Sequence, residues 1–107
     1  MSCQIKFTDT AKSDLREIAF YIAEQSKDKE IAKRFVEELR ERCKILEDFT
    51  ESGSIPRDRV LKSNGYRFIV HKDYLIFYSY NKSDNTAYIL AVFSSKRDFF
   101  RVMKKFI

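Results

Sequence analysis

The stretch from Gly65 to Phe93 constrains the fold more than any other part of the chain. It contains eight of the 16 aromatic residues, in three runs (residues 65–71, 74–80 and 87–93) that are rich in β-branched and aromatic side chains. Because runs of this kind, bounded by turn-forming residues, are typical of paired strands, the stretch predicts a three-stranded antiparallel meander. Lys72–Asp73 is expected to form a tight turn, and Asn81–Asn85 a looser one.

The first half of the chain has the spacing of helices. A short alternating strand, Gln4–Phe7, comes first, and Thr8 or Thr10 is expected to cap the helix that follows and fades near residues 25–26. The apolar stripe of this helix steps by three and four residues and consists of Ala11, Leu15, Ile18 and Ile22. Asp28 is expected to cap a second helix with the stripe Ile31, Phe35, Leu39, Cys43 and Leu46. The short connection between them predicts an antiparallel helical hairpin.

The remaining segments complete an α+β prediction. The pattern breaks at residues 50–56, and Val60–Leu61 is expected either to begin a short strand or to stay in a loop. A basic C-terminal helix is predicted from the helical spacing of Phe99, Val102, Met103 and Phe106. We therefore expect an N-terminal helical hairpin packed on a small twisted antiparallel β-sheet, followed by a short C-terminal helix.

Length and composition indicate one soluble globular domain over residues 1–107. Charged residues make up 35% of the chain and hydrophobic residues 44%, which is unlike a disordered protein. No apolar run is long enough for a signal segment or a membrane span, so we expect neither secretion nor membrane insertion. The two cysteines, Cys3 and Cys43, have no metal-binding spacing and are expected to be free thiols in the cytoplasm, although one disulfide is compatible with the sequence.

Charge is divided unevenly along the chain. Residues 8–51 carry 9 basic and 12 acidic side chains, whereas residues 52–107 carry 11 basic and 4 acidic ones. The basic second half favours a face that binds phosphate groups or an acidic protein. Solubility alone is the other explanation of such a charge.

Several classes of active site are disfavoured by the residue types present. The chain has one histidine, His71, which is expected at the surface, so histidine-based triads and metal sites are very weak candidates. Two glycines cannot make a glycine-rich phosphate loop, and no pair of carboxylates stands out. We expect no metal and no cofactor.

The stronger candidates are cations around the predicted sheet. Arg67 lies in the first strand of the meander, and Arg97 follows the last strand beside Lys96. A guanidinium binds phosphate through two hydrogen bonds and keeps its charge. Lys62 precedes Arg67 by five residues and is expected on the same side of the sheet. In the structural alternative, Arg67 pairs with Asp73 or a helix carboxylate and only stabilises the fold.

Taken together, these segments resemble a known family. The chain opens with Phe7–Thr8, Ala11, Asp14–Leu15, Ile18 and Tyr21–Ile22. It continues with residues 65–68 (Gly-Tyr-Arg-Phe) and 73–78 (Asp-Tyr-Leu-Ile-Phe-Tyr), and it ends with residues 89–93 followed by Lys96, Arg97 and Asp98. In order and spacing, over nearly the whole chain, they are similar to the RelE/ParE superfamily, the toxins of type II toxin–antitoxin modules.

The resemblance implies a growth inhibitor with one of two activities. RelE-like members cleave mRNA in the ribosomal A site, and ParE-like members inhibit DNA gyrase without nuclease residues. Arg67 and Arg97 match the catalytic arginines of the RelE pattern, and Lys62 is the nearest match to its lysines. Residues 94–107 depart from that pattern because they contain no tyrosine or histidine to act as a base. Cleavage of mRNA is the first hypothesis and gyrase inhibition the alternative. A third hypothesis is a folded relative that binds an antitoxin and has no remaining toxicity.

The resemblance also implies partners. The expected ones are a cognate antitoxin and either the ribosome with its mRNA or DNA gyrase, and no membrane is involved. The residues expected at nucleic acid are Lys62, Lys96, Phe99 and Arg101. The antitoxin is expected to be an acidic amphipathic helix or an extended strand lying near Phe100, Met103 and Phe106. Packing of these apolar residues on the chain's own sheet is the alternative.

Overall fold

The computed structural model describes residues 2–97, 101, 102 and 104 of the chain. In this part the elements follow the order β1 (Gln4–Phe7), α1 (Asp9–Ser26), α2 (Lys29–Cys43), η1 (Lys44–Glu47), α3 (Arg59–Ser63), β2 (Tyr66–His71), β3 (Tyr74–Asn81) and β4 (Thr86–Ser94). Arg101 and Val102 are helical and Lys104 is in a 3-10 conformation, and the other residues of the predicted C-terminal helix lie outside the described residues.

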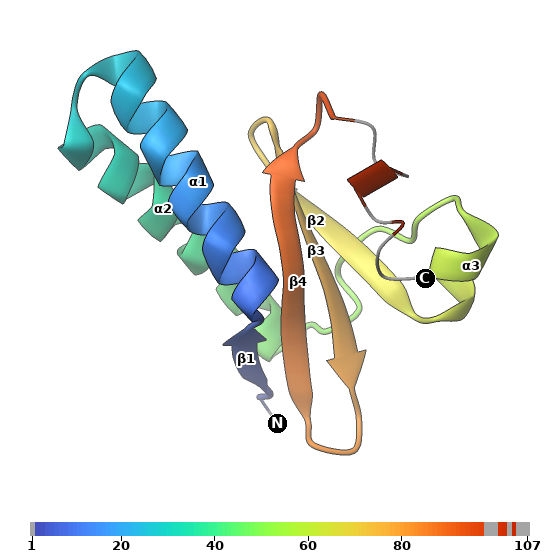
Figure 1. Ribbon diagram of the computed structural model, residues 1–107. Helices are drawn as coiled ribbons and strands as arrows, with labels where there is room; N and C mark the ends of the chain where they lie inside the picture. The colour runs from blue at the N-terminus through green and yellow to red at the C-terminus, as the bar shows by residue number, and fades with distance from the viewer. Residues whose placement is uncertain (1, 98–100, 103, 105–107) are drawn as a thin grey trace.

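The sheet contains the predicted meander and one further strand. Its order is β1-β4-β3-β2, and β3 is antiparallel to both β2 and β4. The first strand pairs with β4 in the parallel direction, from Gln4 opposite Thr86 to Phe7 opposite Ile89, so the complete sheet is mixed. Figure 1 shows β1 at the edge of the sheet, leading directly into α1.

The helical hairpin begins and turns where the sequence predicts. The side chain of Thr8 accepts a hydrogen bond from the Ala11 amide at 3.1 Å, and the Asp28 carboxylate accepts one from the Glu30 amide at 2.9 Å. Each of these bonds satisfies an amide that has no partner within the helix. Lys27, with φ 58°, adopts the left-handed conformation that ends α1 and lets the chain reverse.

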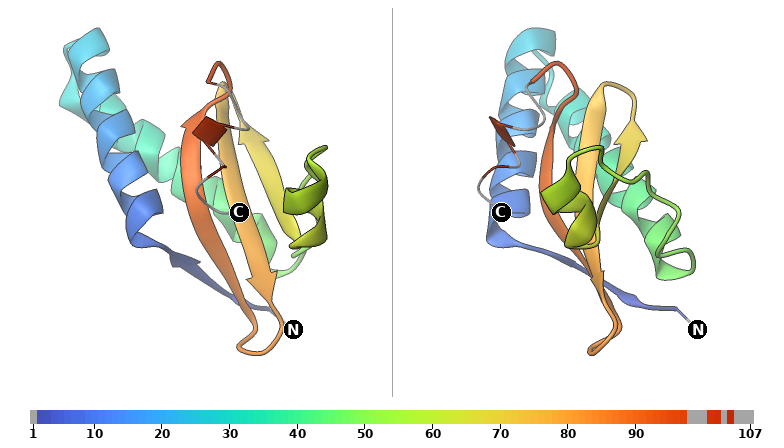
Figure 2. Two further views of the ribbon diagram at one scale, coloured as in Figure 1. Left: turned by 45° about the vertical axis from the view of Figure 1, so that its right-hand side comes forward. Right: turned by 90° about the vertical axis from the view of Figure 1, so that its right-hand side faces the viewer.

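Two apolar clusters lie on opposite faces of the sheet, because side chains alternate along each strand. The hairpin-side core includes Leu15, Ile18, Leu39, Ile69, Ile76, Tyr78 and Ile89. The smaller α3-side core consists of Leu61, Phe77, Ala91 and Phe93, with Tyr66 and Phe68 packed against it. Figures 1 and 2 show the hairpin on one face and α3 on the other.

The segment around Val60 and Leu61 forms a short helix rather than the predicted strand or loop. The Asp58 carboxylate caps α3 by accepting hydrogen bonds from both of their amides, each at 3.0 Å. Leu61 is fully buried in the α3-side core, whereas Val60 is exposed. Two adjacent apolar residues are compatible with a strand. A helical turn forms instead because Asp58 caps it and because it buries Leu61 while Val60 stays exposed.

Candidate functional site

Arg67 lies on β2 and stabilises the loop that precedes α3. It is opposite Tyr78 in the register of β2 and β3, so its side chain is on the hairpin face of the sheet. Its guanidinium Nη1 donates to the backbone carbonyls of Gly53 at 3.0 Å and Glu51 at 3.2 Å. These contacts differ from the pairing with Asp73 or a helix carboxylate that was the structural alternative.

Tyr78, on β3, also stabilises the loop that precedes α3. Its hydroxyl donates to the Thr50 carbonyl at 2.7 Å and accepts a hydrogen bond from the Gly53 amide at 3.0 Å. Burial raises the pKa of the Tyr78 hydroxyl, which keeps it protonated and able to donate. Together with Arg67, this side chain fixes residues 50–53 against the sheet.

Arg97 and Lys96 lie at the other end of the sheet, in the turn after β4. The Arg97 amide donates to the Ser94 carbonyl at 3.1 Å, and both basic side chains are exposed. They line a cleft of about 420 Å³ between α1 and the sheet, whose other polar residues include Asp14, Glu17 and Asp73. The carboxylates give this cleft a mixed charge rather than a uniformly positive one.

The structure does not bring Arg67 and Arg97 together. Arg67 on β2 is opposite Tyr78 on β3, and Tyr78 is opposite Ile89 on β4. Ile89 is five residues before Ser94, where β4 ends. At about 3.3 Å per residue, this places Arg67 roughly 15 Å along the strands from the end of β4. Arg97 lies beyond that end, two strands away across the sheet. The two guanidinium groups therefore do not share one phosphate in this conformation.

The remaining predicted binding residues also lie apart. Lys62 is exposed on α3, which packs on the face of the sheet opposite Arg67, so the expected common side is wrong for this pair. Arg101 is exposed and lines a hollow of about 310 Å³ with Arg97, Asp14 and Glu17. Phe99, Phe100, Met103 and Phe106 lie outside the described residues, and their predicted roles stay predictions.

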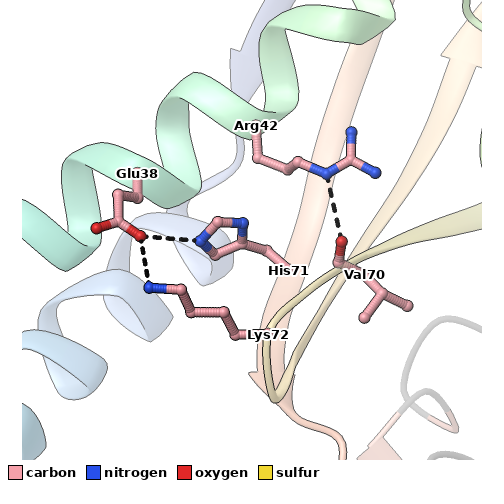
Figure 3. Close-up of polar contacts among 5 residues, drawn as sticks. All are labelled: Glu38, Arg42, Val70, His71 and Lys72. Carbon is pink, nitrogen blue, oxygen red and sulfur yellow. Dashed lines mark hydrogen bonds and ion pairs between the residues drawn. The ribbon is translucent and has the colours of Figure 1, made fainter.

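A polar cluster that sequence reasoning missed joins α2 to the β2–β3 turn. Figure 3 shows the Glu38 carboxylate between two basic side chains: its Oε1 accepts from Lys72 Nζ at 3.0 Å and lies 3.1 Å from His71 Nε2. His71 is only 20% exposed at its side chain and contacts the Phe35 ring, so it is not the surface residue that was expected. A separation of 33 residues leaves no local signal for this pairing.

The Glu38 cluster predicts a pH-dependent contribution to stability. The hydrogen bond from Lys72, and then that from His71, lowers the pKa of the Glu38 carboxyl. The folded state therefore binds the proton less readily than the unfolded chain, where the pKa is about 4.3. The stabilisation should be complete above that value and disappear as the pH falls through the lowered pKa.

The test compares wild type with Glu38→Gln by urea unfolding from pH 5.5 to 3. We expect the difference in free energy of unfolding to be constant above about pH 4.3 and to shrink as the pH falls below that value. Glu37→Gln, on the same helix, is the control, because no contact of Glu37 like that of Glu38 occurs among the described residues. A difference for Glu38→Gln that does not change with pH would contradict the assignment.

Within the described residues, the cysteines and acidic groups do not form a reactive or metal-binding site. Cys3 and Cys43 are buried free thiols, and burial raises the pKa of Cys43 to about 12, so it stays protonated. No group of three or more potential ligands that could hold a metal ion occurs in this part of the chain. None of its helices has the length and apolarity of a membrane span.

Comparison with known proteins places this geometry in context. A family model described as the ParE toxin of the type II toxin–antitoxin system, parDE, matches residues 5–99. No curated protein sequence matches the chain.

Among solved structures, the chromosomal ParDE toxin–antitoxin system of P. aeruginosa aligns with a TM-score of 0.71 and 19% identity, over 87% of this chain and 96% of that one. The toxin–antitoxin complex RelBE2 of Mycobacterium tuberculosis aligns with a TM-score of 0.60 and 21% identity, over 88% and 99%. The isolated RelE toxin of E. coli aligns with a TM-score of 0.50 and 15% identity, over 99% and 100%. At these identities the similarity shows a common fold.

Proposed function

Because this chain belongs to the ParE toxin family of type II toxin–antitoxin systems, we propose that it arrests growth by binding and inhibiting DNA gyrase. It is a toxin of the RelE/ParE superfamily, and a cognate antitoxin is its partner within the module. The family membership does not specify the cellular target, and DNA gyrase as the target is our proposal. It replaces mRNA cleavage as the first hypothesis.

The separation of Arg67 and Arg97 is the observation that carries the proposal. Cleavage of RNA by its 2′-hydroxyl needs a base for the proton and cations that converge on the phosphate. Arg67 instead donates to two loop carbonyls, and Arg97 lies beyond the opposite end of the strands. This arrangement supports a toxin that acts by binding a protein, for which no convergent catalytic group is required.

Cleavage of mRNA on the ribosome remains the second candidate, and one contact favours it. The Glu38 carboxylate holds His71 in a fixed orientation, as a carboxylate does for many histidine general bases. Lys62, Lys96, Arg97 and Arg101 are all exposed and able to contact phosphate groups. His71 would supply the base that residues 94–107 lack.

Two measurements separate these candidates. We expect the purified chain to abolish supercoiling by gyrase in vitro, and primer extension on RNA from induced cells to show intact transcripts. Cuts at ribosomal A sites together with normal supercoiling would establish the RNA mechanism instead.

Arg67→Gln adds an independent test of the same proposal. Losing the two loop contacts should lower the free energy of unfolding by about 1–2 kcal/mol. At temperatures where the variant is folded, gyrase inhibition should stay within about twofold of wild type, since Arg67 serves the loop. A hundredfold loss of toxicity in a fully folded variant would contradict this role.

A further inference from the structure

The loop that precedes α3 displays an aromatic side chain that neither core contains. Phe49 is 64% exposed, and Ile45, one helical turn before it, is 40% exposed. The Phe49 amide donates to the Ile45 carbonyl at 3.0 Å, so the two side chains are neighbours on one turn. Figure 1 shows this segment, in green, leaving the end of the hairpin beside β1 and running to α3. We call residues 48–53 the Phe49 loop.

The backbone of the Phe49 loop is held in place, although its aromatic side chain is exposed. The Phe49 carbonyl accepts a hydrogen bond from the Ser52 amide at 3.1 Å. The Thr50 carbonyl and the Gly53 amide are both bonded to the buried Tyr78 hydroxyl. Because the loop is already ordered, a partner that contacts Phe49 loses little of its binding free energy to loop ordering.

A hollow of about 430 Å³ lies beside the Phe49 ring. It is lined by Asp48, Phe49, Thr50, Glu51 and Ser52, so one aromatic ring and two carboxylates border the same space. Neither carboxylate forms an ion pair within residues 2–97, 101, 102 and 104.

The charge of this surface is opposite to that of the chain as a whole. Residues 47–53 contain three acidic side chains and no basic one, whereas the net charge of the chain is +5. The nearest basic residue before them, Lys44, pairs with Glu41 at 3.1 Å, and the Arg67 guanidinium donates to backbone carbonyls. The carboxylates of the hollow therefore attract cations and repel phosphate groups and acidic peptides.

An arginine side chain has the chemistry that this hollow fits. Its planar guanidinium stacks on an aromatic ring and at the same time donates hydrogen bonds to carboxylates. Phe49 supplies the ring, and Asp48 and Glu51 supply the carboxylates, all within one ordered loop.

We infer that the Phe49 loop binds an arginine side chain on a basic surface of the protein that this chain inhibits, which the proposed function identifies as DNA gyrase. An enzyme that acts on DNA needs basic surfaces to contact phosphate groups, and such surfaces repel a chain with a net charge of +5. The Phe49 loop fits them by its charge and by the contact of its ring. The identity of the partner rests on the proposed function, but the preference for arginine rests on the hollow alone.

The first test measures binding to purified gyrase and inhibition of supercoiling by the full chain. Phe49→Ala should weaken both by about tenfold, as truncation of an aromatic contact at the centre of an interface does. Phe20→Ala is the matched control, because Phe20 is 69% exposed on α1 and does not line the hollow. It should change either measurement by less than about twofold.

The carboxylates have their own pair of variants. Asp48→Lys should weaken gyrase binding by about tenfold, because an attraction becomes a repulsion. Glu24→Lys adds the same charge at an exposed position on α1 and should change binding by less than about twofold. All four substituted side chains are exposed, so the Tm of each variant should stay within about 3 °C of wild type. Equal effects of the loop and control variants would overturn the inference.

Arg67→Gln is expected to leave this contact in place. The Arg67 guanidinium donates to two carbonyls that follow Phe49 in the loop. The Phe49 amide and the Thr50 carbonyl are bonded to Ile45 and Tyr78 instead. The twofold limit on the effect of Arg67→Gln therefore agrees with a gyrase contact at Phe49.

A peptide probe tests the hollow without gyrase. Two synthetic 12-residue peptides have the same sequence, except that citrulline in one replaces every arginine of the other, which removes the charge and keeps the shape. In NMR titrations of the full chain, the arginine peptide should shift the amide signals of residues 48–52. The citrulline peptide should bind at least about tenfold more weakly. Equal binding of the two peptides, or unshifted signals at residues 48–52, would overturn the preference for arginine.

The two kinds of measurement separate the inference from the proposed function. If wild-type chain inhibits supercoiling and the Phe49→Ala and Asp48→Lys variants inhibit it equally well, the Phe49 loop is not the contact with gyrase. If wild-type chain leaves gyrase unaffected, the proposed function fails, and the peptide titrations still decide the chemistry of the hollow by themselves.

Discussion

Gly53→Ala is expected to lower the free energy of unfolding by about 3 kcal/mol, at the upper end of the cost of overpacking a buried site. A Cβ at this position would lie 2.6 Å from Tyr78 Cε1, 2.7 Å from the Tyr78 hydroxyl oxygen and 2.8 Å from the Phe68 carbonyl oxygen. Neither the buried ring nor the strand backbone can move easily, and the Gly53 amide would lose its bond to Tyr78. Thermal unfolding should show a fall in Tm of about 15 °C.

Gly65→Ala provides the control, since the two glycines differ in what surrounds them. Gly65 has φ 77° and nothing within 4 Å of an added Cβ, so its substitution costs only backbone strain of about 1 kcal/mol. Equal losses in the two variants would mean that the close packing of the loop on Tyr78 is not what requires glycine at position 53.

Phe77→Ala should cost about 3–5 kcal/mol, as much as a truncation in the larger core. Phe77 is fully buried in the α3-side core, and its ring lies edge-on to that of Tyr66 at 5.2 Å between centroids. Removing it leaves a cavity between the sheet and α3 that the short helix cannot fill. Urea unfolding measures the loss, and Phe77→Leu, which keeps most of the volume, should cost about 1 kcal/mol and stay folded.

Val70→Ala is the comparison for Phe77→Ala. Val70 is on the edge strand β2 and is 46% exposed, so its truncation should change stability by less than about 0.5 kcal/mol. If Phe77→Ala cost no more than this, the α3-side core would be a surface feature and not a second core of the domain.

Most of the fold could be predicted because its signals are local. The three runs rich in β-branched and aromatic residues mark β2, β3 and β4, and an apolar stripe marks each helix of the hairpin. Thr8 and Asp28 mark the helix starts by their own hydrogen bonds. The parallel pairing of β1 with β4 could not be predicted, since four alternating residues do not specify a partner or its direction.

The candidate site was harder to predict because its contacts join distant segments. Arg67 donates to carbonyls of a loop 14 and 16 residues away, and such backbone acceptors leave no mark in the sequence. The prediction for Lys62 assumed that a loop or strand leads to Arg67. The segment instead forms α3, which packs on the face of the sheet opposite Arg67. The predicted strands placed Arg67 within the meander and Arg97 after it. The distance between the two side chains depends on how β2, β3 and β4 are aligned, which the sequence does not specify.

The pairing of β1 with β4 has a consequence for synthesis on the ribosome. Gln4 emerges from the ribosome long before Thr86, its partner in the pairing, so a nascent chain cannot complete its sheet until β4 has been translated. A product that is truncated before β4 lacks the strand in the middle of the sheet and cannot reach the native state. For a toxin, this delays the formation of a folded, active chain until β4 has been translated.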